Sequence, residues 1–375
     1  MTSYFRGFGL VMISAIIIAL SLTSVKAGIK KEQDNSKEIV MKKLAKAASD
    51  GEFCFGHQDS YFYGKNWVRG EADKTAPWRS DIKDVCGDFP AVLGCDLGGI
   101  ELGLSANLDG VQFDLMREAI KAHHKMGGIV TLSWHQRNPL TNGTSWDSAQ
   151  DSVIRYILPG HPGHVKYLKW LDKIADYIIE LKDDNGNLIP LIFRPYHEHT
   201  EKWFWWGVQD STPDDYKQMW RMTYKYLISK GLTNLIWAYS PNLGTDKDGY
   251  MRNYPGDDYV DILGYDGYQF GEGAARDTYL KAIKSDMAML KELGIKHNKL
   301  IAVTETGYEA IPDKDWWTKT LMNGVKGSGI CYLLVWRNAH NQKRHYYAPF
   351  PGEHSAEDFL KFYDLPETLF LNDLK

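Results

Sequence analysis

Eight short apolar segments, separated by longer stretches with helical spacing of apolar residues, constrain the fold of this chain more than any other feature. The segments are Phe53–Gly56, Ala91–Asp96, Ile129–Trp134, Ile189–Pro195, Leu235–Ser240, Ile262–Tyr265, Leu300–Thr304 and Tyr332–Trp336. Because they are apolar throughout, each is expected to be a strand covered on both faces, as in a parallel sheet. The intervening sequence predicts helices at Glu38–Ala48, Gln112–Met126, Val165–Leu181, Pro213–Lys230, Thr278–Leu293 and Trp316–Asn323.

Eight alternating units predict a single α/β domain folded as a (β/α)8 TIM barrel. An open doubly wound sheet is the alternative, but no glycine-rich phosphate loop follows the first segment. The length of 375 residues would also permit two domains. Barrels of this class often form one unit at such lengths, and no linker divides the sequence. We therefore expect one barrel domain over residues 28–375.

Residues 1–27 have the pattern of a secretory signal peptide. Arg6 precedes an apolar run from Phe8 to Leu22, and Val25 and Ala27 are the small residues before a cleavage position. The run is at the short end of the roughly 20 residues that a spanning helix needs, so a retained membrane anchor is the weaker alternative. The chain is therefore expected to be exported, to the periplasm or the medium, without a stable anchor.

The four cysteines leave the redox state of the protein open. Cys54, Cys95 and Cys331 lie in predicted strands and Cys86 in a predicted loop. No cysteine precedes Cys54, which argues against a lipid-modified cysteine at the cleavage position. An exported protein can form disulfides, but the spacing indicates no pairing, and buried free thiols are the alternative.

Composition narrows the class of partner. A net charge of −4 at pH 7 gives no basic surface for nucleic acid or an anionic membrane. The 13 Trp and 22 Tyr residues offer flat apolar faces with polar tips, which suit sugar rings, although many must belong to the core. We expect a monomer that acts on a neutral substrate without a cofactor.

Polar residues gather where the predicted strands end. In a (β/α)8 barrel, catalytic groups come from the C-terminal ends of the strands and the loops after them. The residues at these positions are His57, Gln58, Asp59, His135, Gln136, Tyr196, His197, Glu198, His199, Asn242, Asp266, Tyr268, Glu305, Arg337 and Asn338. Together they predict a site at one end of the barrel.

Two glutamates of this set suggest the chemistry. Most glycosidases use two carboxyl groups, one to protonate the leaving oxygen and one that, in retaining enzymes, attacks the anomeric carbon about 5–5.5 Å away. Glu198 ends the fourth strand and Glu305 the seventh, so they can face each other across the barrel mouth. The alternative is that each only forms an ion pair, with Arg194 or Lys202.

Two segments, Phe193–Gly207 and Val303–Gly307, resemble glycoside hydrolase family 26, whose members are mainly β-1,4-mannanases. The matching features are the His197-Glu198 pair, Trp203 five residues later, and a tryptophan-rich turn that ends in glycine. The resemblance implies that Glu198 is the acid/base and Glu305 the nucleophile of a retaining endo-acting enzyme on mannan, glucomannan or galactomannan. Relatives that cut mixed-linkage β-glucan or β-xylan provide the alternative substrates.

The resemblance extends to other motifs, from about Phe53 to His340. It implies that His135 in Ser133–Pro139 and the pair Trp336-Arg337 bind sugar, that Tyr268 orients the nucleophile, and that Asp261 and Asp266 support or bind at the site. It departs at His199-Thr200-Glu201, where many members have Asn-Gly. This difference alters the loop beside the acid/base.

The physical roles can be stated from the residues. Glu305 must be ionised to attack, and Tyr268 is a plausible hydrogen-bond donor to it. Burial against Trp203 and the charge of Glu305 would raise the pKa of Glu198, which keeps it protonated. Trp203 and Trp336 are expected to stack on sugar, whereas Trp205 and Trp206 are expected in the core. His197 is expected to bind substrate or to hold its neighbours.

Two other functions compete with the glycosidase. His197 and His199 would point to the same side of an extended strand and could chelate a metal, although no third ligand cluster is evident. A glycan-binding protein without catalysis could use the same aromatic residues, but it would need no pair of glutamates. In the hydrolase, the loops Asn138–His164 and Tyr239–Tyr259 are expected to wall the groove.

Overall fold

The computed structural model describes residues 36–375, except 71, 72, 74, 149–151, 209–211, 243 and 245. The predicted signal peptide lies outside this range. No helix among the described residues is both long and apolar enough to cross a membrane.

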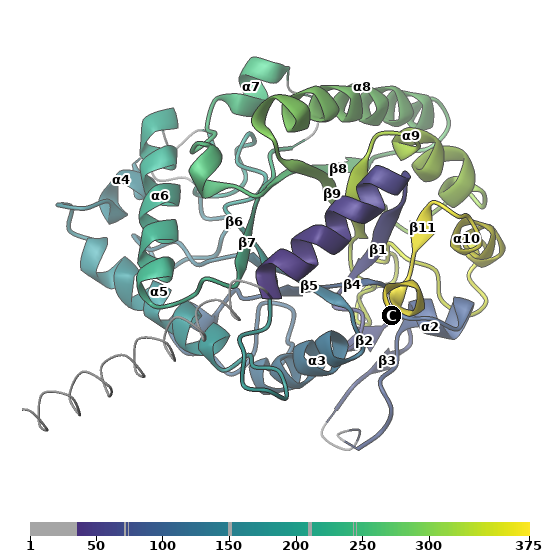
Figure 1. Ribbon diagram of the computed structural model, residues 1–375, viewed down its shortest axis with the longest axis horizontal. Coiled ribbons are helices and arrows are strands. Elements are labelled where there is room, and N and C mark those ends of the chain that lie inside the picture. The colour runs from purple at the N-terminus through teal and green to yellow at the C-terminus, as the bar shows by residue number, and fades with distance from the viewer. Residues whose placement is uncertain are drawn as a thin grey trace, which may run out of the picture.

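Within the described chain, eight parallel strands close into a barrel, which confirms the predicted fold (Figure 1). The strands are β1 (Phe53–Gln58), β4 (Val92–Asp96), β5 (Ile129–Trp134), β6 (Leu191–Pro195), β7 (Leu235–Tyr239), β8 (Ile262–Gln269), β9 (Leu300–Tyr308) and β10 (Ile330–Val335). Each strand pairs with the next along the chain, and β10 pairs with β1 to close the ring. A two-residue strand, β11 (Thr368–Leu369), pairs with β1, and β2 (Tyr63–Gly64) and β3 (Trp67–Val68) form a separate hairpin.

Two barrel strands extend further than their apolar runs indicate. β8 continues to Gln269 and β9 to Tyr308, so Asp266, Tyr268 and Glu305 lie within strands and not after them. The two strands pair along this whole upper part, with Tyr268 opposite Gly307. The residues of the site are thereby held on paired backbone, which places their side chains more rigidly than a loop would.

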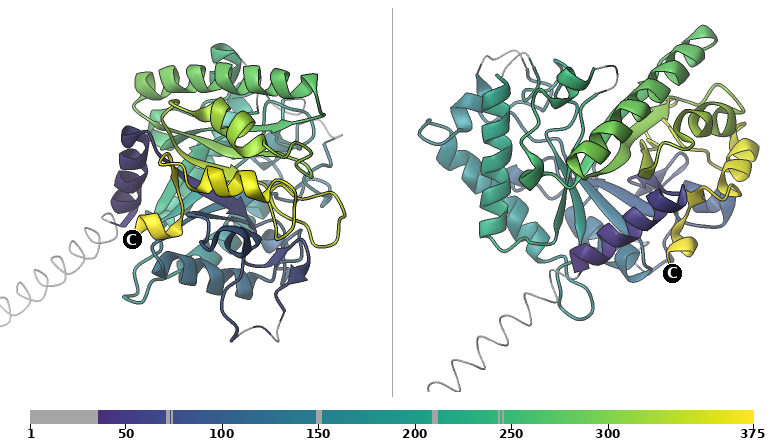
Figure 2. Two further views of the ribbon diagram at one scale, coloured as in Figure 1. Left: turned by 90° about the vertical axis from the view of Figure 1, so that its right-hand side faces the viewer. Right: turned by 45° about the horizontal axis from the view of Figure 1, so that its top comes forward.

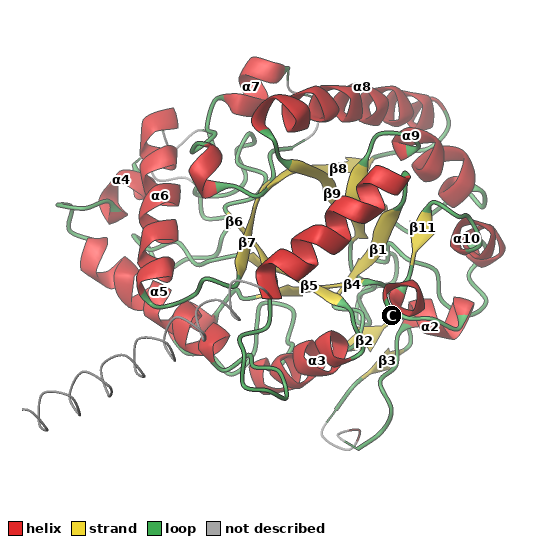
Figure 3. Cartoon of the chain, viewed as in Figure 1, coloured by secondary structure: helices red, strands yellow, loops and turns green. Residues whose placement is uncertain are grey.

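Helices surround the strands (Figure 3). The longer ones are α3 (Phe113–Lys125), α5 (His164–Ile179), α6 (Pro213–Ser229), α8 (Ala274–His297) and α10 (Ala356–Tyr363). The shorter ones are α2 (Asp81–Cys86), α4 (Val153–Ile157), α7 (Lys247–Met251), α9 (Asn323–Val325), η2 (Ile100–Leu102), η3 (Asp257–Tyr259), η4 (Trp317–Met322) and η5 (Leu371–Leu374). α6 begins where the sequence indicates, because the Thr212 hydroxyl accepts from the Asp215 amide and Pro213 occupies the first turn.

A helix over residues 36–50 covers the N-terminal end of the barrel. Its apolar residues Val40 and Leu44 pack with strand residues that include Ile129 and Ile262. In Figure 2, left, this helix and the C-terminus lie on the same side of the barrel. Lys37 Nζ forms an ion pair with Asp261 Oδ2 at 2.9 Å. Asp261 precedes β8 and thus lies at the opposite end from Glu305, so its expected part in the site is wrong.

In the described structure all four cysteines are free thiols. Cys54, Cys95 and Cys331 are buried in strands as expected, and burial raises the pKa of the Cys54 thiol to about 12. Cys86 is the last residue of α2 and does not lie in a loop.

Candidate active site

The end of β6 is shaped by two residues with left-handed backbone conformation. Tyr196 and Glu198 both have φ near +53°, which is rare for residues other than glycine and turns the chain sharply after Pro195. The Glu198 amide donates to the Ser240 carbonyl at 2.8 Å, which ties this turn to the end of β7. The strand therefore stops before the His-Glu-His sequence begins.

This turn removes the premise of the metal hypothesis. His197 and His199 do not lie on an extended strand, and their rings have separate surroundings. His197 contacts His135, whereas the His199 ring lies 4.4 Å from that of Tyr216 and its Nδ1 is 3.1 Å from Asn253 Nδ2. No group of three or more His, Cys, Asp or Glu side chains among the described residues could hold a metal ion.

A cavity of about 590 Å³ opens at the C-terminal ends of the strands. Its lining combines both glutamates with aromatic residues from several loops: His135, Trp146, Glu198, Glu201, Trp203, Phe204, Asn242, Asp266, Gly267, Tyr268, Phe270, Glu305, Trp336 and Tyr347. The loops expected to wall the groove contribute Trp146 and Asn242. Glu198 and Glu305 are thus brought into one cavity, as the sequence indicates.

Glu305 is held by two donors that favour its ionised form. Arg194 Nη2 donates to Glu305 Oε2 at 2.5 Å, and the Tyr268 hydroxyl donates to Oε1. Both partners are fixed, because Arg194 is 2% exposed and Tyr268 belongs to the paired part of β8. The ion pair with Arg194 that the sequence offers as an alternative role of Glu305 is present, and Glu305 also lines the cavity. A carboxylate in this arrangement is oriented by both of its oxygens, as a nucleophile requires.

Asp266 anchors Arg194 from the cavity floor. It is fully buried, receives Arg194 Nη1 at 2.6 Å on Oδ2, and receives the Thr304 hydroxyl at 2.6 Å on Oδ1. Burial, against the opposing effect of Arg194, raises the pKa of Asp266 to about 7. Because both oxygens already have partners, this side chain holds the guanidinium more directly than it could hold a sugar.

Glu198 has the opposite electrostatic setting. It is 9% exposed, and burial together with the charge of Glu305 raises its pKa well above the usual value. The Trp203 indole nitrogen donates to Oε2 at 2.8 Å, which opposes that rise. One carboxyl group is therefore stabilised as an anion while the other favours its proton, the division of roles that acid catalysis needs.

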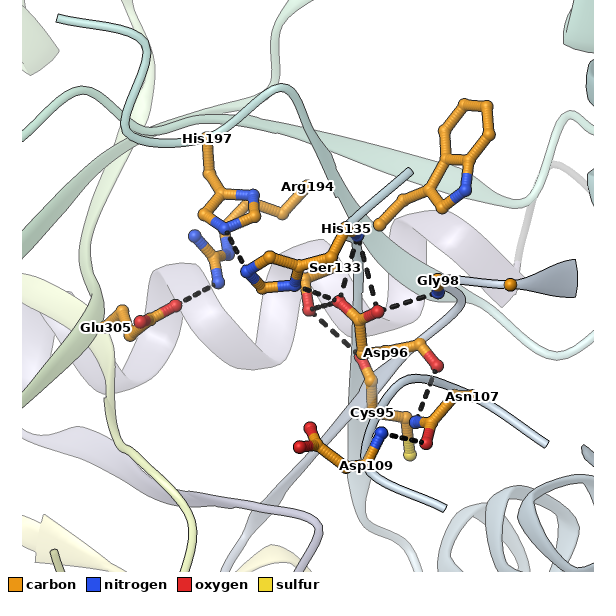
Figure 4. Close-up of polar contacts among 12 residues, drawn as sticks. Cys95, Asp96, Gly98, Asn107, Asp109, Ser133, His135, Arg194, His197 and Glu305 are labelled. Carbon is orange, nitrogen blue, oxygen red and sulfur yellow. Dashed lines mark hydrogen bonds and ion pairs between the residues drawn. The ribbon is translucent and has the colours of Figure 1, made fainter. Parts of the chain in front are cut away.

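His135 stands at the cavity wall in a buried polar network (Figure 4). Its Nδ1 lies 2.7 Å from Asp96 Oδ2, which also accepts from the Ser133 hydroxyl, and its Nε2 lies 3.1 Å from His197 Nε2. Burial lowers the pKa of His135, but Asp96 outweighs it and raises the pKa overall. Burial lowers the pKa of His197 well below its usual value. We therefore assign His135 as the donor and neutral His197 as the acceptor.

His197 and Arg337 lie outside the lining of this cavity. His197 is 1% exposed and stands behind His135, a position that favours its alternative role of holding neighbours. Arg337 forms an ion pair with Asp109 at 2.8 Å and borders an adjacent cavity that includes Tyr63. The neighbouring Trp336 does line the first cavity.

The tryptophans divide as expected between cavity and core. Trp203 is 41% exposed, whereas Trp205 and Trp206 are fully buried and donate to the carbonyls of Gln136 and His197. Trp146 was not predicted. Its ring stacks on His135 with 5.5 Å between centroids, and as a half-exposed loop residue it carries no signal in sequence.

The chain is similar to known glycosyl hydrolases in sequence and in structure. The sequence pattern of glycosyl hydrolase family 26 matches residues 34–345. A β-mannanase of this family from Bacteroides ovatus is 44% identical, with a TM-score of 0.85 over 90% of this chain and 95% of that chain. An endo-β-1,4-mannanase from Cellulomonas fimi is 30% identical, with a TM-score of 0.76 over 89% of this chain and 76% of the other.

Two curated relatives match this chain over part of their own length. A mannan endo-1,4-β-mannosidase of Bifidobacterium adolescentis is 30% identical over 82% of this chain and 32% of its own length. One from Bacillus subtilis is 33% identical over 50% of this chain and 53% of its own length. The matched region thus spans about a third to a half of these two relatives. With the family pattern covering most of the sequence, the chain belongs to glycosyl hydrolase family 26.

Proposed function

We propose that this chain is a retaining endo-β-1,4-mannanase, with Glu305 as nucleophile and Glu198 as acid/base. The observation that carries the proposal is the pairing of two unlike carboxyl groups in one cavity. Glu305 is held as an anion by Arg194 and Tyr268, and Glu198 is buried with its pKa raised. The curated relatives named as mannan endo-1,4-β-mannosidases support mannan as the substrate.

The reaction follows from these settings in two steps. In the first, the Glu305 carboxylate attacks the anomeric carbon while Glu198 donates its proton to the departing glycosidic oxygen. Formation of the ester removes the charge of Glu305, which lowers the pKa of Glu198 because that charge is one cause of its rise. In the second, Glu198 takes a proton from water, the water oxygen bonds to the anomeric carbon, and Glu305 is released. We expect the two carboxyl groups about 5–5.5 Å apart for this mechanism.

The remaining residues bind and orient the sugar in this proposal. His135 lines the cavity wall with both ring nitrogens already bonded, to Asp96 and His197, and Trp203 and Trp336 offer apolar faces. Asp266 and His197 act as positioning residues, through Arg194 and His135 respectively. Arg337 would bind sugar only where the substrate extends into the adjacent cavity that it borders. We also propose export by the signal peptide, and a monomer.

Hydrolysis assays test the proposal directly. The protein is incubated with mannan, lichenan and xylan, and products are separated by chromatography. We expect manno-oligosaccharides, with Glu305→Ala inactive and Glu198→Ala inactive on mannan but active on aryl mannosides with good leaving groups. If lichenan or xylan is cleaved faster than mannan, that polysaccharide is the substrate instead. Wild-type rates in both variants would refute the roles assigned to Glu198 and Glu305.

A further inference from the structure

Phe270 is an exposed aromatic side chain at the rim of the proposed active site. It is 82% exposed, yet it lines the same cavity as Glu198 and Glu305. Single exposed apolar residues are common on protein surfaces and need no explanation. Here two further aromatic side chains at the same cavity, Trp146 and Trp203, are 51% and 41% exposed. The rim of this cavity is therefore an aromatic surface.

The position of Phe270 follows from the alternation of side chains along β8. Asp266 and Tyr268 point into the barrel mouth, where they reach Arg194 and Glu305. Successive side chains of a strand point to opposite faces, so a residue two positions after Tyr268 continues the same face. Phe270 is that residue, and its ring lies 6.2 Å from that of Tyr268, centroid to centroid.

The backbone that leads to Phe270 is anchored by the two residues before it. Gln269, which points away from the cavity, accepts from the Trp316 indole at 2.9 Å and is buried. Tyr268 is paired with Gly307 in β9. Gly271 then has φ +86°, a left-handed conformation that turns the chain away toward α8. The ring is thus presented at the mouth by a fixed backbone and faces solvent.

The acid/base indicates which sugar would meet this ring. Glu198 must donate its proton to the oxygen of the leaving sugar, so that sugar lies against the loop that follows Glu198. Glu201 and Trp203 of this loop line the cavity. The Thr200 hydroxyl accepts a hydrogen bond at 3.0 Å from the amide of Asn242, which follows β7. Phe270, which follows the next strand, continues this wall. Arg337 and its adjacent cavity follow β10 and belong to the other side of the mouth.

We propose that Phe270 is the stacking platform for the sugar on the leaving-group side, and that it favours a carbohydrate over water as acceptor. The inference rests on the proposed retaining mechanism. In the second step an acceptor hydroxyl takes the place of water: its oxygen bonds to the anomeric carbon, the ester bond to Glu305 breaks, and Glu198 receives the hydroxyl proton. An acceptor sugar stacked on Phe270 would be held in position for this attack, whereas an acceptor without a ring would gain nothing.

Acceptor competition tests the platform. An aryl β-mannobioside serves as donor, with mannobiose or methanol as acceptor, and mass spectrometry gives the ratio of transfer to hydrolysis. For Phe270→Ala we expect transfer to mannobiose to fall by about 5- to 10-fold, since stacking and apolar contact are lost, with methanol transfer within about twofold of wild type. Phe270→Trp should restore transfer to mannobiose. Ile295→Ala, which removes a 76% exposed side chain from the far end of α8, is the matched control and should match wild type.

The outcomes separate this inference from the proposed function. Equal loss of transfer to both acceptors, or no loss to either, in a variant that still hydrolyses the donor would overturn the platform alone. Wild-type protein that transfers to methanol but not to mannobiose would overturn it as well. Wild-type protein that turns over no β-mannoside at all would overturn the proposed function, and the platform with it.

Discussion

Replacement of Trp203 by phenylalanine isolates one hydrogen bond at the proposed acid/base. The Trp203 indole donates to Glu198 Oε2 at 2.8 Å and so stabilises the ionised carboxylate. This contact lowers the pKa of Glu198, against burial and the charge of Glu305, which raise it. Phenylalanine keeps an apolar face for sugar but cannot donate. The pKa of Glu198 should therefore rise further in Trp203→Phe.

The size of the effect can be bounded. A hydrogen bond to a charged group contributes about 1.5–3 kcal/mol, and about 1.36 kcal/mol corresponds to one pH unit. Because Trp203 is 41% exposed, water can replace the lost donor in part. We therefore expect the basic limb of the kcat/KM profile to move upward by about half to one pH unit.

The assay is kcat/KM against pH on a manno-oligosaccharide. The first step needs protonated Glu198, so kcat/KM falls as pH rises through its pKa, and a higher pKa moves that limb upward. The acidic limb should stay in place, because the substitution removes no contact of Glu305. Trp146→Phe is the matched control, since Trp146 lines the same cavity at similar exposure but stacks on His135. An unmoved or lowered basic limb, with only the plateau reduced, would refute the role of the indole bond.

Two further predictions concern stability. Arg194→Met leaves the carboxylates of Glu305 and Asp266 buried without their shared cation. We therefore expect the unfolding free energy, measured by denaturant titration, to fall by about 3–5 kcal/mol. An unfolding free energy equal to that of the wild type would contradict the stabilising role of these ion pairs. Glu198→Gln should raise Tm relative to wild type at pH 8 but not at pH 4. Because the pKa of Glu198 is raised in the folded state, wild-type stability is full below the unfolded pKa of this group and is lost as pH rises toward its folded pKa. Equal Tm differences at both pH values would show that ionisation of Glu198 does not oppose folding.

The position of the site within the fold was predictable because parallel barrels place strand ends together. Glu198 and Glu305 are 107 positions apart in sequence, yet both follow the apolar run of a barrel strand and so reach one mouth. The sequence offers Arg194 only as an alternative ion-pair partner and does not predict that it joins Glu305 to Asp266. A charged residue between Phe193 and Pro195 in an apolar strand was the available signal, because a buried charge needs a partner.

The predicted ends of β8 and β9 differ from those in the structure for a physical reason. The sequence predicts Asp266 and Glu305 after their strands, because polar side chains usually end a buried apolar run. At the barrel mouth a strand can continue with polar residues that point inward, because the cavity and its ion pairs satisfy them. The motif places Asp261 in the site, although this residue precedes β8 and pairs with Lys37 at the other end of the barrel.

Sequence by itself determined the elements and the barrel, because runs of apolar residues that do not alternate are stable only when covered on both faces. It also indicated the two glutamates, because each follows an apolar run on the same side of the predicted barrel. Only the tertiary structure decided which side chains face the cavity. The left-handed turn at Tyr196 and Glu198 directs Glu198 inward and His197 toward His135. Such a turn depends on contacts with β7 that are distant in sequence, so no local pattern could report it.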